Sequence, residues 1–260
     1  MPVDEPHRVL CHLDDLLERR GMTLAALVFL VGLPVQALLW LATRPVDPNL
    51  VAPGRFLRRV GVALGRCYPP WRLRLEGDWP EQGGPFVVVA NHQSMLDIVL
   101  LSRVPEEMKW VAKQELFDVP WIGWMMRLAG DIPVRRGDVG SGGAAMERAG
   151  AYLGRGMSVM MFPEGTRSRD GRMLTFKPGA FRLAIRAGVP ILPVVVSGTA
   201  PGLPKGGLAV APCDAVARIL PPFSTEGLTE ADAGALRTRV RNAMAAELPA
   251  PKTDEGLPSS

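Results

Sequence analysis

A histidine and a carboxylate stand five positions apart in segment 91–97 (Asn-His-Gln-Ser-Met-Leu-Asp), which directly follows the apolar run 86–90. In one continuous helix, five residues at about 100° each would turn Asp97 roughly 140° away from His92. We therefore expect His92 before a helix and Asp97 inside it. The carboxylate would then accept the imidazole Nδ1 proton and leave Nε2 free as a base.

This pair is two thirds of a hydrolytic triad, but the chain has no Gly-x-Ser-x-Gly elbow, and Ser94 lies too close to His92 along the chain to be its partner. A base without an enzyme nucleophile can act when the substrate supplies the hydroxyl, which then attacks an acyl carbonyl. The pattern indicates acyl transfer without a covalent intermediate. A helix-capping histidine beside a surface aspartate is the alternative for this pair alone.

A second polar cluster, segment 162–169 (Phe-Pro-Glu-Gly-Thr-Arg-Ser-Arg), follows the apolar run 157–161. Gly165 permits close backbone approach, Arg167 offers a planar fork for phosphate oxygens, and Glu164 can accept hydrogen bonds from a polyol. Taken alone, the segment is equally consistent with an ordinary turn that carries a surface arginine.

Two further apolar runs, 132–134 and 189–196, belong to the same pattern, and the first ends in Arg135 and Arg136. Ligands of open α/β sheets collect at the carboxyl ends of strands. We therefore expect the polar clusters to converge on one crevice.

In order and spacing, these segments resemble the glycerolipid acyltransferase family, the lysophosphatidic acid acyltransferases, over roughly residues 86 to 198. Arg135 departs from the family pattern, in which an acid or polar residue is common. Segment 111–116 also resembles a family segment, in which the lysine helps to hold the substrate phosphate. The matched positions are Asn91, His92, Ser94 and Asp97, then Gly130, Ile132 and Arg136, then all of 162–168, and finally 189–194.

The resemblance implies that His92 takes the proton of the 2-hydroxyl of 1-acylglycerol-3-phosphate while Asp97 orients the imidazole, and that the product is phosphatidic acid, made in phospholipid biosynthesis. It implies that Arg136, Arg167 and Lys113 hold the phosphate and that Glu164 positions the glycerol. The expected substrate-binding residues are thus Lys113, Arg136, Glu164, Gly165, Thr166 and Arg167.

This chemistry requires neither a metal nor a bound cofactor, and the acyl donor is expected to be a thioester of coenzyme A or of acyl carrier protein. The sequence leaves two other functions open. One is an acyltransferase for another lysolipid, such as lyso-ornithine lipid. The other is a non-catalytic lipid-binding membrane protein, which would have no need of His92 together with Asp97.

The chain of 260 residues carries a formal net charge of +4, which suits anionic lipid or phosphate. Aromatic residues make up only 6% and no nucleic-acid module is visible, so nucleic acid is not an expected partner. Cys11, Cys67 and Cys213 are widely spaced, which predicts neither a disulfide framework nor a zinc site but reduced thiols in a cytosol-facing protein.

The N-terminal region is typical of a membrane-associated protein, because no charged residue lies between Arg20 and Arg44. Such a run can span a bilayer core of about 30 Å. Pro34 either kinks a single span or divides the run into two short helices that enter and leave one leaflet, and we favour re-entry. A buried helix of a soluble protein is the alternative.

The segment that follows is strongly basic, with seven arginines against Asp47 alone between Arg44 and Arg74. We expect residues 54–67 to form an interfacial helix that faces anionic headgroups. The protein would then lie on the cytoplasmic face of the cell inner membrane, as a monotopic or single-span protein that meets lysophosphatidic acid there.

The alternation of apolar runs and helical patterns predicts an α/β fold, with a mixed, largely parallel sheet covered by helices. Residues 1–67 are expected to form the membrane-associated helical region, 68–248 the acyltransferase domain and 249–260 a disordered tail. Predicted strands are 72–76, 86–90, 109–112, 131–134, 157–162, 190–196 and either 207–211 or 215–219; predicted helices lie near 95–103, 121–128, 143–154, 178–187 and 229–247. Trp110, Trp121, Trp124, Met125 and Met126 either line an acyl-chain groove or pack in the core.

Overall fold

The computed structural model describes residues 24–81, 83–168, 172–203 and 210–248, with the backbone alone for residues 24–29. Within these ranges one seven-stranded sheet has the order β1-β7-β6-β2-β5-β3-β4. Its strands are β1 (Trp71–Glu76), β2 (Val87–Ala90), β3 (Met108–Lys113), β4 (Ile132–Val134), β5 (Ser158–Met161), β6 (Ile191–Ser197) and β7 (Cys213–Ile219). Every neighbouring pair is parallel except β6 with β7, so the predicted mixed, largely parallel sheet is confirmed.

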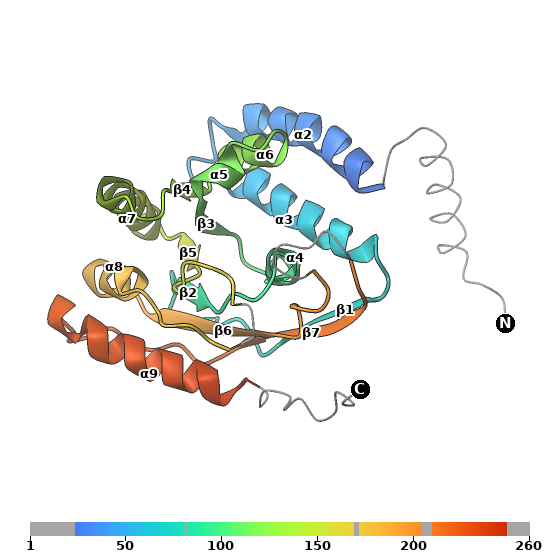
Figure 1. Cartoon of the computed structure of the whole chain (residues 1–260). Coiled ribbons are helices and arrows are strands. Elements are labelled where there is room, and N and C mark those ends of the chain that lie inside the picture. Colours follow the sequence, from blue (N-terminus) through green and yellow to red (C-terminus); the bar gives the residue numbers. More distant parts are fainter. Residues whose placement is uncertain (1–23, 82, 169–171, 204–209, 249–260) are drawn as a thin grey trace, which may run out of the picture.

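Helices cover both faces of the sheet (Figure 1). One face carries α7 (Val139–Leu153), α8 (Gly179–Ala187) and α9 (Ala233–Ala246), which follows the short 3-10 helix η1 (Glu230–Asp232). The other carries α4 (Leu96–Leu101) and α3 (Val51–Arg66). Beyond α3 lie α2 (Leu24–Thr43), α5 (Gln114–Phe117) and α6 (Ile122–Leu128).

The central strands β2, β5 and β6 are apolar except for Ser158 and Ser197 at two of their ends, which fits a sheet covered on both faces. All residues of β2 are buried, and Val87 and Val89 face α8 while Val88 and Ala90 belong to the core beneath α4. Such continuous apolar runs are typical of parallel strands inside a helix-covered sheet. The last strand is the second of the two predicted alternatives, since β7 includes residues 215–219. The short helix α5 was not predicted, because a single turn leaves no periodic pattern.

The basic helix α3 does not present its apolar side to lipid, and this part of the prediction is wrong. Leu57 and Val60 are only 6% and 7% exposed, because they pack with Phe117 and Met125 in a small core shared with α5 and α6. An amphipathic helix has the same periodicity whether protein or lipid covers its apolar side, so the sequence could not decide between them. The outer side of α3 exposes Arg55, Arg59 and Arg66.

A buried cluster of charges ties α3 to the sheet. The Lys109 ammonium group is fully buried and donates to the backbone oxygens of Leu50 and Ala129, each at 2.9 Å. Arg58 donates to Asp131 at 2.5 Å. α3 therefore packs on the domain that follows the boundary expected at residue 67, through both apolar and charged contacts.

Part of the N-terminal prediction lies outside the described residues, namely everything before Leu24, as does the tail 249–260. No helix in the described part of the chain is long and apolar enough to cross a membrane. α2 runs through Pro34 as one helix, so the predicted division into two short helices is wrong. Gln36 on its inner side donates to Pro53 O at 2.9 Å and Met125 O at 3.0 Å, which holds α2 against α3 and α6.

Candidate active site

The predicted site residues follow strands that all run in the same direction. His92 follows β2, segment 162–168 follows β5, Lys113 ends β3 and Arg136 follows β4. Because β2, β3, β4 and β5 are parallel, their carboxyl ends meet at one edge of the sheet. The fold thus places the four polar clusters along a common edge.

The imidazole of His92 contacts the carboxylate of Asp97 directly, with 2.6 Å between Nδ1 and Oδ2. His92 precedes α4 and Asp97 is the second residue of that helix, which is the arrangement expected from their spacing. The same carboxylate oxygen accepts the backbone N–H groups of Gln93 at 2.7 Å and Ser94 at 3.0 Å. These bonds orient Asp97, and a proton held on Nδ1 leaves Nε2 as the basic nitrogen.

A residue that the sequence reasoning missed completes the shell around Asp97. The hydroxyl of Thr199, which is fully buried, donates to the other carboxylate oxygen, Oδ1. Thr199 follows β6 and lies 102 positions from Asp97 in sequence. The only signal was its place just after the fourth apolar run, at the same sheet edge as His92.

The side chain of Asn91 holds β2 to β6 at this edge. It accepts from Val196 N at 2.7 Å and donates to Val196 O at 2.8 Å. This pair of hydrogen bonds between a side chain and the backbone continues the contact between β2 and β6 beyond Ala90, the last paired residue of β2. Asn91 therefore fixes how the ends of β2 and β6 are aligned, just before His92 and Thr199 follow these two strands.

The loop after β5 holds His92 from its other side. The ring of Phe162 stacks on the imidazole, with 4.1 Å between ring centroids and 21° between planes. Ser168 N donates to His92 O at 2.8 Å. This loop therefore contacts both the imidazole ring and the backbone of His92.

Glu164 joins two segments through its carboxylate. Oε1 accepts from His92 N at 2.9 Å and Oε2 accepts from Leu174 N at 3.0 Å, while the residue is only 5% exposed. Burial raises the pKa of Glu164 to about 7, although both backbone bonds favour the charged form; the nearby charge of Asp97 raises it further. In this structure Glu164 fixes the loop of the base, and the expected contact with a glycerol hydroxyl stays a prediction.

Basic side chains gather beside this centre. Burial lowers the pKa of Arg136, the neighbouring Arg167 lowers it further, and Glu115 opposes both. Lys113 pairs with Glu115 at 2.8 Å. Two guanidinium groups within electrostatic reach of each other form a place where an anion such as phosphate is stabilised.

The glycine and threonine of the loop directly precede Arg167 in sequence. Gly165 has a φ of +70°, and a Cβ at this position would come within 2.9 Å of the Lys177 side chain. Glycine is therefore favoured by its backbone conformation, and the end of the Lys177 side chain, a further basic residue that the sequence reasoning missed, lies against it. Thr166 is half-buried in the same loop.

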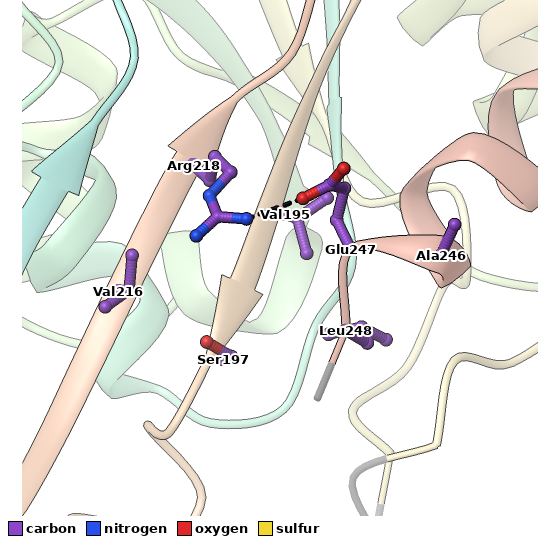
Figure 2. Close-up of a pocket in the computed structure, with 7 residues that line it drawn as sticks. All are labelled: Val195, Ser197, Val216, Arg218, Ala246, Glu247 and Leu248. Atoms are coloured by element: carbon purple, nitrogen blue, oxygen red, sulfur yellow. Dashed lines mark hydrogen bonds and ion pairs between the residues drawn. The ribbon is translucent and has the colours of Figure 1, made fainter. Parts of the chain in front are cut away.

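A hollow elsewhere on the molecule contains none of the predicted site residues. Figure 2 shows it between β6, β7 and the end of α9, with Arg218 and Glu247 paired at 2.5 Å. Its lining residues are Val195, Ser197, Val216, Arg218, Ala246, Glu247 and Leu248. We therefore place the candidate active site by the geometry around His92.

The chain matches the family model described as Acyltransferase over residues 72–197. It is 40% identical over 153 residues to the chloroplastic 1-acyl-sn-glycerol-3-phosphate acyltransferase LPAT1 of Arabidopsis thaliana, which is 58% of this chain and 43% of that protein. It is 42% identical over 163 residues to 1-acyl-sn-glycerol-3-phosphate acyltransferase alpha of Mus musculus, which is 62% of this chain and 57% of that protein. The chain thus spans about half the length of these curated relatives.

A solved structure extends the likeness beyond the matched segment. The crystal structure of the 1-acyl-sn-glycerophosphate (LPA) acyltransferase PlsC from Thermotoga maritima matches with a TM-score of 0.63 and 26% sequence identity, and covers 84% of this chain and 95% of that one. The resemblance predicted from the sequence is confirmed at the level of the family.

Proposed function

We propose that this protein is an O-acyltransferase that moves a fatty acyl group from an acyl thioester to the 2-hydroxyl of 1-acylglycerol-3-phosphate and so forms phosphatidic acid. The observation that carries the proposal is the 2.6 Å contact of His92 Nδ1 with Asp97, which leaves Nε2 as a base beside a pair of arginines. The names of the curated relatives and of the matching solved structure support the choice of substrate.

The chemistry follows from the positions of the two side chains. His92 Nε2 takes the proton of the substrate hydroxyl as its oxygen attacks the thioester carbonyl. The new C–O bond forms, the C–S bond breaks, and the leaving thiolate takes the proton back from the imidazolium. Asp97 stabilises that imidazolium, and no acyl-enzyme is needed.

The acceptor phosphate would bind to Arg136 and Arg167, with Lys113 nearby. The guanidinium forks can form paired, charge-assisted hydrogen bonds with phosphate oxygens. The donor would be acyl-coenzyme A or acyl carrier protein carrying the acyl group as a thioester.

We also propose that the protein works on the cytoplasmic face of the inner membrane. The support is the outer side of α2, where large apolar side chains are exposed, together with the exposed arginines 55, 59 and 66 of α3. The exposed apolar residues of α2 are Leu30, Val31, Val35, Leu38 and Leu41.

Replacing His92 tests the mechanism. His92→Ala should lower the rate of phosphatidic acid formation by about 10²- to 10⁴-fold, since this is the usual contribution of a general base. Asp97→Asn should also cause a large loss, whereas Glu247→Gln in the hollow of Figure 2 should leave the rate unchanged. A purified, folded His92→Ala protein with a rate within tenfold of the parent would exclude His92 as the base.

Arg167→Ala tests the acceptor. We expect a higher KM for lysophosphatidic acid and little change for a lysolipid that lacks the phosphate, with partial rescue by Arg167→Lys because a point charge cannot reproduce the fork. The matched control is Arg182→Ala on the exposed side of α8. Equal losses with both acceptors would assign Arg167 a structural role, and efficient use of lyso-ornithine lipid would favour the alternative acceptor.

A further inference from the structure

Two exposed tryptophan rings lie where α6 begins, Trp121 in the turn between α5 and α6 and Trp124 in the first turn of α6. Trp121 is 42% and Trp124 50% exposed, and their rings meet edge to face with 5.5 Å between centroids. Val119 beside them is 45% exposed. The sequence analysis expected five residues to line an acyl-chain groove or to pack in the core. Trp110, Met125 and Met126 are buried, whereas Trp121 and Trp124 are exposed.

The turn and the start of α6, which carry the two rings, are tightly packed. Trp121 has a φ of +64°, a conformation that a bulky residue rarely adopts. Gly123 lies so close to the backbone of Phe117 that a Cβ would come within 2.1 Å of Phe117 O. Arg127 donates to the same carbonyl oxygen. The exposed rings are therefore held in place by a turn that accepts backbone strain.

The turn lies next to α2 and close to the active-site edge. α2 and α6 lie side by side in Figure 1, and Gln36 bonds to Met125 O at 3.0 Å. α5 begins directly after Lys113, the last residue of β3. The segment that carries the rings thus packs on α2 through α6 and joins the sheet edge of the site through α5.

We propose that Trp121, Trp124 and Val119 insert into the interfacial layer of an anionic bilayer leaflet and hold the active-site edge against it. Indole rings favour this layer, because they combine a large apolar body with one N–H donor. The charge of the surroundings fits: Arg127 beside the rings is half-exposed and pairs with Asp118 at 3.5 Å, and three further arginines are exposed, Arg44 just after α2 and Arg55 and Arg59 on α3. This inference rests on the proposed function, because the leaflet would supply the acylated acceptor lipid.

Binding to vesicles tests the insertion directly. We compare the parent with the double variant Trp121→Ser/Trp124→Ser on vesicles of phosphatidylcholine with and without phosphatidylglycerol. The double variant should bind vesicles that contain phosphatidylglycerol about tenfold or more weakly, since burying one large apolar side chain corresponds to at least that factor. Val119→Ser should weaken binding by a few-fold.

The matched control is Val210→Ser, which removes the same side chain at nearly the same exposure, 46%, on the segment before β7. It should leave vesicle binding unchanged. The conservative variant Trp121→Phe/Trp124→Phe retains apolar bodies and should restore most of the binding, while quenching of tryptophan fluorescence by brominated lipid should fall relative to the parent. Circular dichroism and the thermal midpoint check that each variant is folded.

Two acceptors separate this inference from the proposed function. The double variant should acylate lysophosphatidic acid in vesicles at least tenfold more slowly and a short-chain, dissolved lysophosphatidic acid at the rate of the parent. If the parent acylated neither acceptor, the proposed function would be overturned. The vesicle-binding measurement would still test the insertion. Equal vesicle binding and equal lipid quenching in the parent and the double variant would overturn the insertion. A double variant that differed from the parent only in its oligomeric state would also overturn it.

Discussion

The threonine behind the aspartate is the residue whose role is most directly testable. Thr199 donates to Asp97 Oδ1 from a fully buried position, so it touches neither substrate nor the reacting atoms and acts by positioning. Removing its hydroxyl leaves a buried carboxylate oxygen without this partner, which costs about 1–3 kcal/mol. Without this hydrogen bond Asp97 should hold the His92 imidazole less firmly in its orientation.

We expect Thr199→Val to lower kcat about tenfold with little change in KM, and Thr199→Ser to restore most of the rate. The control is Thr225→Val, because Thr225 is also buried but bonds to Val189 O at 3.0 Å, away from the site. That variant should lose stability and keep its kcat. Equal kcat in the Thr199→Val protein and the parent would show that Asp97 is positioned without the hydroxyl.

Glu164 should make folding stability depend on pH. Its pKa is raised by burial from 4.5 to about 7 in the folded protein, so between these values the folded state holds a proton that the unfolded state has released. The contribution of Glu164 is therefore fully present below pH 4.5 and is lost as the pH rises to about 7. Each pKa unit corresponds to about 1.4 kcal/mol, so the change is on the order of a few kcal/mol.

The measurement is the free energy of unfolding by urea across this pH range. The decline should be visible in the parent and in Glu226→Gln, an exposed control, and should be absent in Glu164→Gln. The same slope in all three proteins would mean that other groups cause it. Glu164→Gln should also slow acyl transfer, because an amide cannot accept from the backbone N–H groups of both His92 and Leu174.

At the scale of elements, α3 belongs to the catalytic core because a buried charge cluster joins them. Arg58 pairs with Asp131 at 2.5 Å and its guanidinium group stacks on Trp110 at 4.5 Å. Burial raises the pKa of Glu107 and lowers that of Lys109, while their contact at 3.1 Å favours the charged form of each. A complete buried cluster of this kind changes the stability of the fold little, whereas removal of one member leaves an uncompensated buried charge and lowers the stability strongly.

Arg58→Ala should therefore lower the free energy of unfolding by about 3–5 kcal/mol, because it leaves buried carboxylates without their cation. Arg59→Ala, at the exposed neighbouring position, should change it by no more than about 0.5 kcal/mol. Chemical unfolding of the purified proteins measures both. Similar values for the two variants would show that the cluster is not a structural link, and a folded, active fragment 68–260 would show the same.

At the scale of the whole molecule, the surface is divided by chemistry. The outer side of α2 is apolar, the outer side of α3 is rich in arginine, and the site lies at the carboxyl edge of the sheet beside α5 and α6. An apolar contact and an attraction to anionic headgroups respond differently to salt, since only the latter is screened.

High salt should therefore not release the protein from membranes, whereas salt together with the double substitution Leu38→Asp/Leu41→Asp should release it. Both residues are more than 60% exposed, at 68% and 65%, so folding should be preserved. The fraction in the supernatant after sedimentation measures release. Release of the parent by salt alone would mean that headgroup attraction is the only anchor.

The sequence alone determined the chemistry and the general architecture. The spacing of His92 and Asp97 requires a helix start between them, because no regular element brings residues five apart face to face, and the structure begins α4 at Leu96. The apolar runs predicted the strands because buried parallel strands must be apolar on both faces. The alternation of strands and helices then predicted the parallel sheet.

Only the tertiary structure decided which partner each polar or amphipathic segment has. The sequence shows the apolar side of α3 but not that protein covers it, and Trp121 and Trp124 but not that they are exposed. Thr199 reaches Asp97 across 102 positions, and Arg58 reaches Asp131 across 73. Local pattern reports the period of a segment and its polarity, whereas the choice among possible partners depends on contacts between segments that are distant in the chain.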